Sequence, residues 1–124
     1  MSASVLGCAS GAHEVVFVAP ALMGGGAERV ACTLAGYCVD HDVPFTFLLT
    51  RCGKVDYDLP AGVEVEDVSR GGSLSPLGQI RAIRRSMHKH PVATFLSFLP
   101  YQNMYTLLAG LGLKNRVVIS VRND

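Results

Sequence analysis

Residues 14–38, EVVFVAPALMGGGAERVACTLAGYC, decide the fold of this 124-residue chain. The run Glu14–Pro20 is a nearly unbroken apolar stretch rich in β-branched and aromatic residues, which is the pattern of a strand covered on both faces in a parallel sheet. After the glycines, apolar residues recur at helical spacing, namely Ala27, Val30, Ala31, Leu34, Ala35 and Cys38. The segment therefore predicts a central strand, a glycine-rich turn and a helix with a buried stripe.

Two more strands and a second helix are predicted in the middle of the chain. Phe45–Thr50 is a second apolar run, and Val63–Glu66 alternates apolar with acidic residues, as expected for a strand at the edge of a sheet. Ser75 followed by Pro76 is typical of a helix cap and a first-turn proline. We expect the apolar stripe of this helix to consist of Leu77, Ile80, Ile83 and Met87.

The remaining elements complete an alternation of strands and helices. They are a buried strand at Val92–Phe98, a helix at Tyr101–Leu111 and a fifth strand at Val117–Val121. Strands separated by helices predict right-handed crossovers and a doubly wound, Rossmann-like α/β fold. We expect a parallel sheet of about five strands in the order 3-2-1-4-5, with the ligand crevice beyond their carboxyl ends.

Composition limits the chain to one ordinary domain. With 124 residues, 49% of them hydrophobic, it can bury a single core, which we place at residues 14–124, and we expect residues 1–13 to be a flexible tail. A net charge of +1 argues against nucleic acid as a partner, because such binding needs a strong basic excess. The four cysteines lack C-x-x-C spacing, which favours a cytoplasmic protein, and no apolar run is long enough to span a membrane.

The end of the chain also carries a prediction. The chain stops at Asp124, three residues after the expected fifth strand, and no helix comes after that strand to cover it. We therefore expect the chain to be a truncated part of a longer protein. Because uncovered apolar edge strands pair readily with other chains, we also expect the isolated domain to form a homodimer.

The glycine run Gly24-Gly25-Gly26, followed by Ala27, lies between the first predicted strand and helix. Backbone N–H groups at a helix start, with no side chains in the way, favour phosphate binding; the alternative is simply a tight turn. A dinucleotide site is disfavoured because Arg29 occupies the third glycine position and Thr50 stands where an acidic ribose ligand belongs. A P-loop is disfavoured because the glycines are not followed by lysine and a hydroxyl residue.

Five segments, taken together, resemble the retaining GT-B glycosyltransferases of family four. They are Ala19-Pro20, the glycine loop and helix start at residues 24–30, Leu59-Pro60, residues 97–103 and residues 120–124. The resemblance covers residues 13–124 and implies the acceptor-binding, amino-terminal half of a GT-B fold. The Glu-x7-Glu motif usual in the other half, which binds most of the sugar nucleotide, does not occur in this chain.

The resemblance also implies roles for single residues. Gly24, Gly25, Gly26 and Ala27 would contact the donor diphosphate, and the acceptor wall would comprise Glu28, Tyr101, Gln102, Asn103 and Asn123. Arg122 stands where many relatives carry a histidine; it cannot act as a base, but it can stabilise leaving-group charge. The alternatives are a plain helix start at Pro100–Asn103 and a frayed chain end at Arg122. The intact enzyme would transfer a sugar from a nucleotide sugar to a glycan or lipid-linked acceptor, with no metal or other cofactor.

The outer face of the second helix is basic, through Arg81, Arg84, Arg85, His88 and Lys89. It is either a solvated helix face or a contact with anionic lipid headgroups at the inner face of the cell membrane. Two other classes of function stay open. One is a stand-alone nucleotide- or phosphate-binding module, which the glycine loop permits. The other is a non-catalytic interaction domain that pairs through an open sheet edge.

Overall fold

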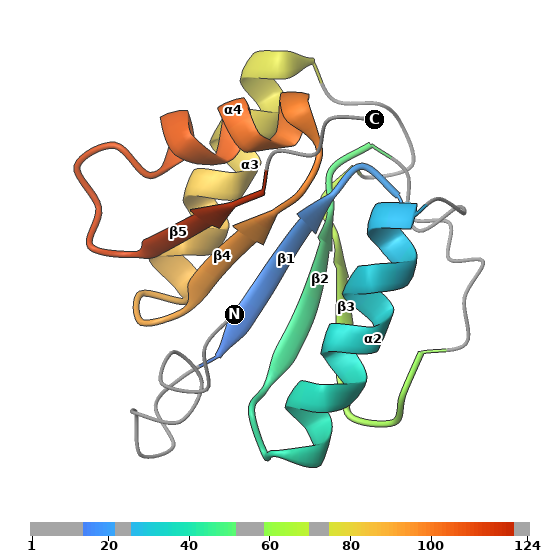
Figure 1. Cartoon of the computed structure of the whole chain (residues 1–124). Coiled ribbons are helices and arrows are strands. Elements are labelled where there is room, and N and C mark those ends of the chain that lie inside the picture. Colours follow the sequence, from blue (N-terminus) through green and yellow to red (C-terminus); the bar gives the residue numbers. More distant parts are fainter. Residues whose placement is uncertain (1–13, 22–25, 52–58, 70–74, 121–124) are drawn as a thin grey trace.

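A computed structural model describes residues 14–21, 26–51, 59–69 and 75–120 of the chain (Figure 1). The expected tail, residues 1–13, lies outside this part. The elements, in chain order, are β1 (Val15–Ala19), α2 (Gly26–Asp40), β2 (Phe45–Leu49), β3 (Val63–Asp67), α3 (Pro76–Lys89), β4 (Thr94–Ser97), α4 (Pro100–Ala109) and β5 (Arg116–Ile119). The fold class predicted from the sequence is confirmed: strands alternate with helices, apart from the direct step from β2 to β3.

The strands form one parallel sheet in the order β3-β2-β1-β4-β5. The register places Val15 of β1 opposite Phe45 of β2 and opposite Thr94 of β4. This is the predicted order, and it puts the point where the chain reverses its direction of winding between β1 and β4. The carboxyl ends of both strands therefore meet at the same edge of the sheet, where such folds bind ligands.

Helices cover both faces of the sheet, as Figure 1 shows. On one face, Phe17 and its neighbours pack against Ala31, Ala35 and Cys38 of α2. On the other face, Val16 and Val18 pack against Ile83 and Met87 of α3 and Ala109 of α4; all of these are buried. Alternate residues of β1 thus serve opposite halves of the core, which explains why the whole strand had to be apolar.

Three apolar residues predicted to be buried are exposed. Val30 lies outside the narrower α2 stripe formed by Ala31, Ala35 and Cys38. Leu77 is two positions from the buried Gln79 and so points to the opposite side of α3. Val92 belongs to the turn before β4, which begins only at Thr94. In each case the pattern predicted the correct helix or strand. It made the buried face of the helix too wide at Val30 and Leu77, and it began the strand too early at Val92.

Hydrogen bonds beyond the strands hold their carboxyl ends in register. The backbone N–H groups of Thr50 and Arg51 donate to the carbonyls of Ala19 and Pro20, each at 3.0 Å. The ring of Phe98, just after β4, packs edge-on against Phe17, with ring centroids 5.0 Å apart. The loops that leave β1, β2 and β4 therefore start from fixed positions.

Candidate functional site

The start of α2 is the position that the glycine run predicted. Gly26 is the first residue of the helix, and Ala27 and Glu28 belong to its first turn. A helix of 15 residues beginning beyond β1 directs its first N–H groups toward the carboxyl edge of the sheet. The helix start is thus confirmed, while the phosphate contact stays a prediction, because Gly24 and Gly25 lie outside the described residues.

A cavity of about 310 Å³ opens at the same edge. Four elements contribute to it: the ends of β1 and β2, the first turn of α3 and the first turns of α4. Its lining comprises Pro20, Arg51, Pro76, Gln79, Tyr101, Gln102 and Tyr105. One cation, two amides and two phenol rings thus converge where the topology places a ligand, and this combination suits a polyhydroxylated ligand.

A buried set of polar side chains, Thr50, Gln79 and Gln102, lies at this cavity, and the two glutamines line it. The Thr50 hydroxyl donates to Gln79 Oε1 at 3.0 Å, and Gln102 Nε2 donates to the same oxygen at 3.2 Å. The Thr106 hydroxyl donates to the Gln102 carbonyl at 2.6 Å. Leaving buried polar groups unpaired would cost folding free energy. These hydrogen bonds therefore hold β2, α3 and α4 together at one point.

Tyr101 forms the exposed rim of the cavity. Its residue surface is 70% accessible, and its ring stacks on that of Tyr105 with centroids 6.4 Å apart. An exposed aromatic ring beside two amides can pack against the apolar face of a sugar while the amides bind hydroxyl groups. Tyr101 and Gln102, predicted from the sequence as acceptor residues, are therefore neighbours in one cavity.

Asn103, the third residue predicted in this group, lies apart from that cavity. It is buried, and its Nδ2 donates to the carbonyl of Ser120 at 3.0 Å, which joins α4 to the end of β5. Its Oδ1 and the buried Ser97 hydroxyl have no hydrogen-bond partner among the described residues. Asn103 thus has a structural contact of its own, and its role toward an acceptor stays a prediction. Arg122 and Asn123 lie outside the described part of the chain.

Sequence reasoning missed Arg51, Gln79 and Tyr105. Arg51 directly follows the end of β2, so the rule that ligands bind beyond strand ends could have found it. Gln79 stands four positions before Ile83 and eight before Met87, on the buried side of α3. A glutamine at that spacing signals a buried amide with a partner.

Among the cysteines in the described ranges, Cys38 lies in the core and gives no sign of nucleophilic chemistry. Cys38 belongs to the core beneath α2, and burial raises the pKa of its thiol above the usual value. A thiol with a raised pKa stays protonated at neutral pH and is a poor nucleophile. Cys38 therefore acts as a core residue, as expected from its place on the apolar stripe.

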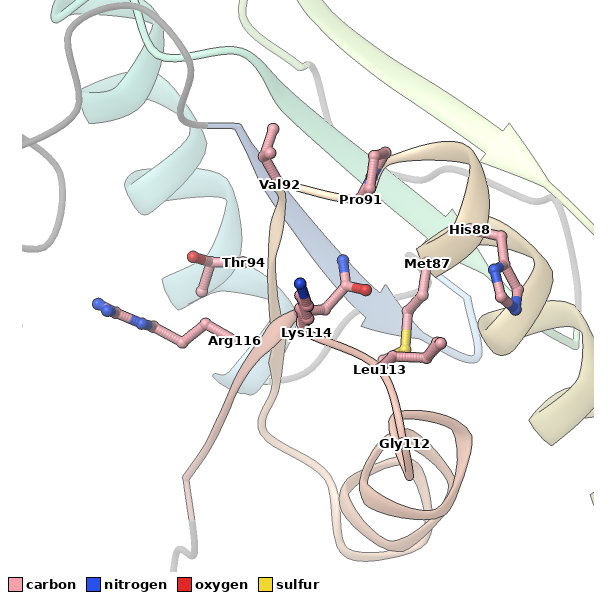
Figure 2. Close-up of a pocket in the computed structure, with 10 residues that line it drawn as sticks. Met87, His88, Pro91, Val92, Thr94, Gly112, Leu113, Lys114 and Arg116 are labelled. Atoms are coloured by element: carbon pink, nitrogen blue, oxygen red, sulfur yellow. The ribbon is translucent and has the colours of Figure 1, made fainter.

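A larger hollow, of about 600 Å³, lies at the opposite, amino-terminal edge of the sheet. Figure 2 shows it between the end of α3 and the turn that leads into β5, with Met87 and Leu113 among the residues that line it. The Asn115 amide in its lining already donates to the carbonyls of His90 and Ala93, at 2.8 and 3.3 Å. The smaller cavity is therefore the better candidate for chemistry, because its polar groups converge at the carboxyl ends of the strands.

Comparison with known proteins adds one relative. Over 119 residues the chain is 30% identical to an enzyme of Campylobacter jejuni subsp. jejuni serotype O:2, "GalNAc-alpha-(1->4)-GalNAc-alpha-(1->3)-diNAcBac-PP-undecaprenol alpha-1,4-N-acetyl-D-galactosaminyltransferase". This similarity, together with the parallel α/β sheet, supports a glycosyltransferase domain. It covers 90% of the chain and 33% of the relative, so the chain spans about a third of that enzyme's length. No protein-family model matches the chain.

Proposed function

We propose that this chain is the acceptor-binding, amino-terminal domain of a GT-B glycosyltransferase resembling family four. The complete enzyme transfers a sugar from a nucleotide sugar to a lipid-linked saccharide. The chain alone is inactive in this proposal, because most of the nucleotide-sugar site belongs to a second domain. The 30% identity to a transferase whose name includes PP-undecaprenol supports the class of acceptor.

One observation carries the proposal, namely the cavity at the carboxyl ends of β1 and β2. Its lining pairs the exposed ring of Tyr101 with the amides of Gln79 and Gln102 and with the cationic Arg51. The rings and amides suit a saccharide, and a guanidinium suits the diphosphate that joins a saccharide to its lipid. The cavity therefore offers groups for both parts of such an acceptor.

In this proposal, the start of α2 binds the nucleotide-sugar donor. Gly24, Gly25, Gly26 and Ala27 bind the donor diphosphate through backbone N–H groups and the positive end of the helix dipole. Glu28 and Asn123 bind acceptor hydroxyl groups, and Arg122 stabilises charge on the leaving phosphate. No metal or other cofactor enters, since N–H groups and arginine meet the negative charge.

The test is calorimetric binding of an α-1,4-linked N-acetylgalactosamine disaccharide to the purified chain. We expect saturable binding that Tyr101→Ala weakens roughly tenfold, because the exposed ring supplies the stacking surface. Tyr37→Ala is the matched control: Tyr37 is also exposed, but it lies on α2, where its ring stacks on His41. This control should bind like the unmodified chain.

The same titration separates the rival functions. Binding of a nucleoside diphosphate without binding of any saccharide would favour a stand-alone phosphate-binding module. Absence of both would favour an interaction domain. Equal saccharide affinity in the Tyr101→Ala variant and the unmodified chain would show that the saccharide does not bind in this cavity.

A further inference from the structure

The larger hollow, at the amino-terminal edge of the sheet, has no part in the proposed function. It lies between the end of α3, the start of β4 and the turn that leads from α4 into β5 (Figure 2). The helices beside it have 14 and 10 residues, and no helix in the described ranges is long and apolar enough to cross a membrane. The volume of the hollow, about 600 Å³, falls in the usual range of sites for small molecules.

Hydrogen bonds from side chains to backbone carbonyls fix the walls of the hollow. Arg84 of α3 donates through Nη1 to the carbonyl of Leu111 at 2.7 Å, which holds the turn against α3. Asn115, at the other end of the turn, donates to the carbonyls of His90 and Ala93, at 2.8 and 3.3 Å. The turn is therefore attached to α3 and to the approach to β4. A hollow with such walls is preformed, as most small-molecule sites are.

Two cations bring positive charge to the hollow, Lys114 in the turn and Arg116 at the start of β5. Both are exposed, and within the described part of the chain neither side chain makes an ion pair or a hydrogen bond. No Asp or Glu lines the hollow, and none occurs in residues 68–123. Glu14, before β1, has its carboxylate 3.2 Å from His90 Nδ1 and is already engaged. The positive charge in the hollow is therefore not neutralised from its walls.

A hydroxyl group lies beside one of these cations. Thr94 and Arg116 are partners in the parallel register of β4 and β5, so their side chains share one face of the sheet. Figure 2 shows both directed to the same side, with Lys114 between this pair and Leu113. Thr94 is only 7% accessible, yet its hydroxyl makes no hydrogen bond with any described residue. A guanidinium beside a free hydroxyl donor suits a carboxylate, which accepts several hydrogen bonds at once.

We propose that this hollow binds a small organic carboxylate with an apolar body. The carboxylate accepts from the Arg116 guanidinium and the Thr94 hydroxyl, and Lys114 adds a second positive charge. The apolar body packs on Leu113, which itself rests on the core, and on Val92, which is 59% accessible. The site requires neither the saccharide cavity nor sugar transfer, because it lies at the opposite edge of the sheet.

Other classes of ligand fit this lining less well. The described residues that line the hollow include no Phe, Tyr or Trp, and a neutral saccharide would leave both cations unused. A metal ion would find only His88, since no Cys, Asp or Glu belongs to the lining. A nucleic acid needs more phosphate contacts than two cations offer. An organic carboxylate uses the cations, the hydroxyl and the apolar side chains together.

The test is calorimetric titration of the chain with 3-phenylpropionate and with compounds that each lack one of its features. We expect saturable binding of 3-phenylpropionate that weakens in high salt. Its neutral amide should bind at least about tenfold more weakly, because the charge that the two cations meet is gone. Acetate should also bind at least about tenfold more weakly, because it has no apolar body to bury.

Substitutions locate the site on the chain. Arg116→Gln should weaken the binding of 3-phenylpropionate roughly tenfold, and Thr94→Val, which keeps the shape but not the hydroxyl, roughly threefold. Arg116→Lys keeps the charge without the paired N–H groups and should bind between Arg116→Gln and the unmodified chain. Arg29→Gln is the matched control, because it removes an exposed cation from α2, and it should bind like the unmodified chain. Thermal unfolding midpoints show that each variant is folded.

Four results would overturn the proposal. They are no saturable binding by the folded chain, equal binding of 3-phenylpropionate and its amide, equal losses in Arg29→Gln and Arg116→Gln, and tighter binding of phenyl phosphate than of 3-phenylpropionate. The N-acetylgalactosamine disaccharide, titrated into the same chain, keeps this proposal separate from the proposed function. Binding of the disaccharide alone would overturn the carboxylate site and leave the saccharide cavity standing, and binding of 3-phenylpropionate alone would do the reverse.

Discussion

The two edge strands of the sheet are built in opposite ways. β3, at one edge, alternates Val63 and Val65 with the acidic Glu64 and Glu66. β5, at the other edge, continues from Arg116 into three apolar residues, of which Val118 and Ile119 are exposed. Acidic residues on an edge strand discourage pairing with another chain, whereas an apolar edge invites it.

The contrast extends to what lies beside each edge. Glu66 of β3 accepts from Lys89 Nζ at 3.3 Å, so this edge is tied to α3 by a charged contact. β5 adjoins α4, whose outward face is apolar and uncharged. The β3 edge of the sheet thus suits exposure to water, and the β5 edge suits contact with a partner. The fold requires only that each edge strand pairs with its inner neighbour.

The largest expected effects lie in the core, one strand in from each edge, where substitutions on the two sides of the sheet should cost similar stability. Phe47 of β2 and Phe95 of β4 are fully buried, each one strand in from an edge. Phe47→Ala and Phe95→Ala should each lower the free energy of unfolding by about 3–5 kcal/mol, the usual cost of such a cavity. Chemical denaturation measures both. A loss near zero for Phe95→Ala alone would mean that the β5 side is loosely packed.

A second substitution tests the polar link between the two halves. Gln79→Leu leaves the Thr50 hydroxyl, on the β3 side, and the Gln102 amide, on the β5 side, without their shared acceptor. We expect a loss of about 1–3 kcal/mol in the free energy of unfolding. Gln79→Glu keeps an acceptor oxygen, and near pH 5, where a buried carboxyl stays protonated, it should lose less. Equal losses in both variants at that pH would contradict the role of that oxygen.

A smaller effect concerns self-association, which was predicted from the sequence for the apolar fifth strand. We expect a weak homodimer that pairs through β5, in sedimentation velocity over a concentration series. Ile119→Lys should shift it to monomer, because a charge on the edge opposes pairing. Val65→Lys on β3 is the matched control and should leave association unchanged. A monomer at every concentration would mean that both edges are closed to pairing.

The smallest effect belongs to the charged contact at the β3 edge. Lys89→Met removes the pair with Glu66, whose side chains are 65% and 26% accessible. Because water and salt screen such contacts, the free energy of unfolding should fall by less than about 1 kcal/mol. A larger loss in thermal or chemical unfolding would show that this contact holds the β3 edge in place.

The sequence predicted the fold well because its signals were local. The run Val15–Ala19, the spacing of Ala31, Ala35 and Cys38, and the Ser75-Pro76 helix start each specify one element. Ser75 caps α3 as predicted, with its hydroxyl accepting from the Gly78 N–H at 3.1 Å. Once the elements were placed, right-handed crossovers limited the strand order to very few arrangements.

The site was predicted only in part because it depends on contacts distant in sequence. Tyr101 and Gln102 were found from their place after β4, but Gln79 joins them only through packing of α3 against α4. The exposed apolar side of α4, with Met104, Leu107 and Leu108, was not predicted, for a related reason. An apolar run indicates that some face is covered, but periodicity does not say which partner covers it.

Nuclear magnetic resonance shift mapping with the N-acetylgalactosamine disaccharide tests the central assignment most directly, since it locates the acceptor site on the chain. We expect shifts in the amide signals of Arg51, Gln79, Tyr101 and Gln102, around the cavity at the carboxyl ends of the strands. Signals of Val92, Lys114 and Arg116, at the other edge, should stay unchanged. Shifts confined to that other edge, or to neither edge, would contradict it.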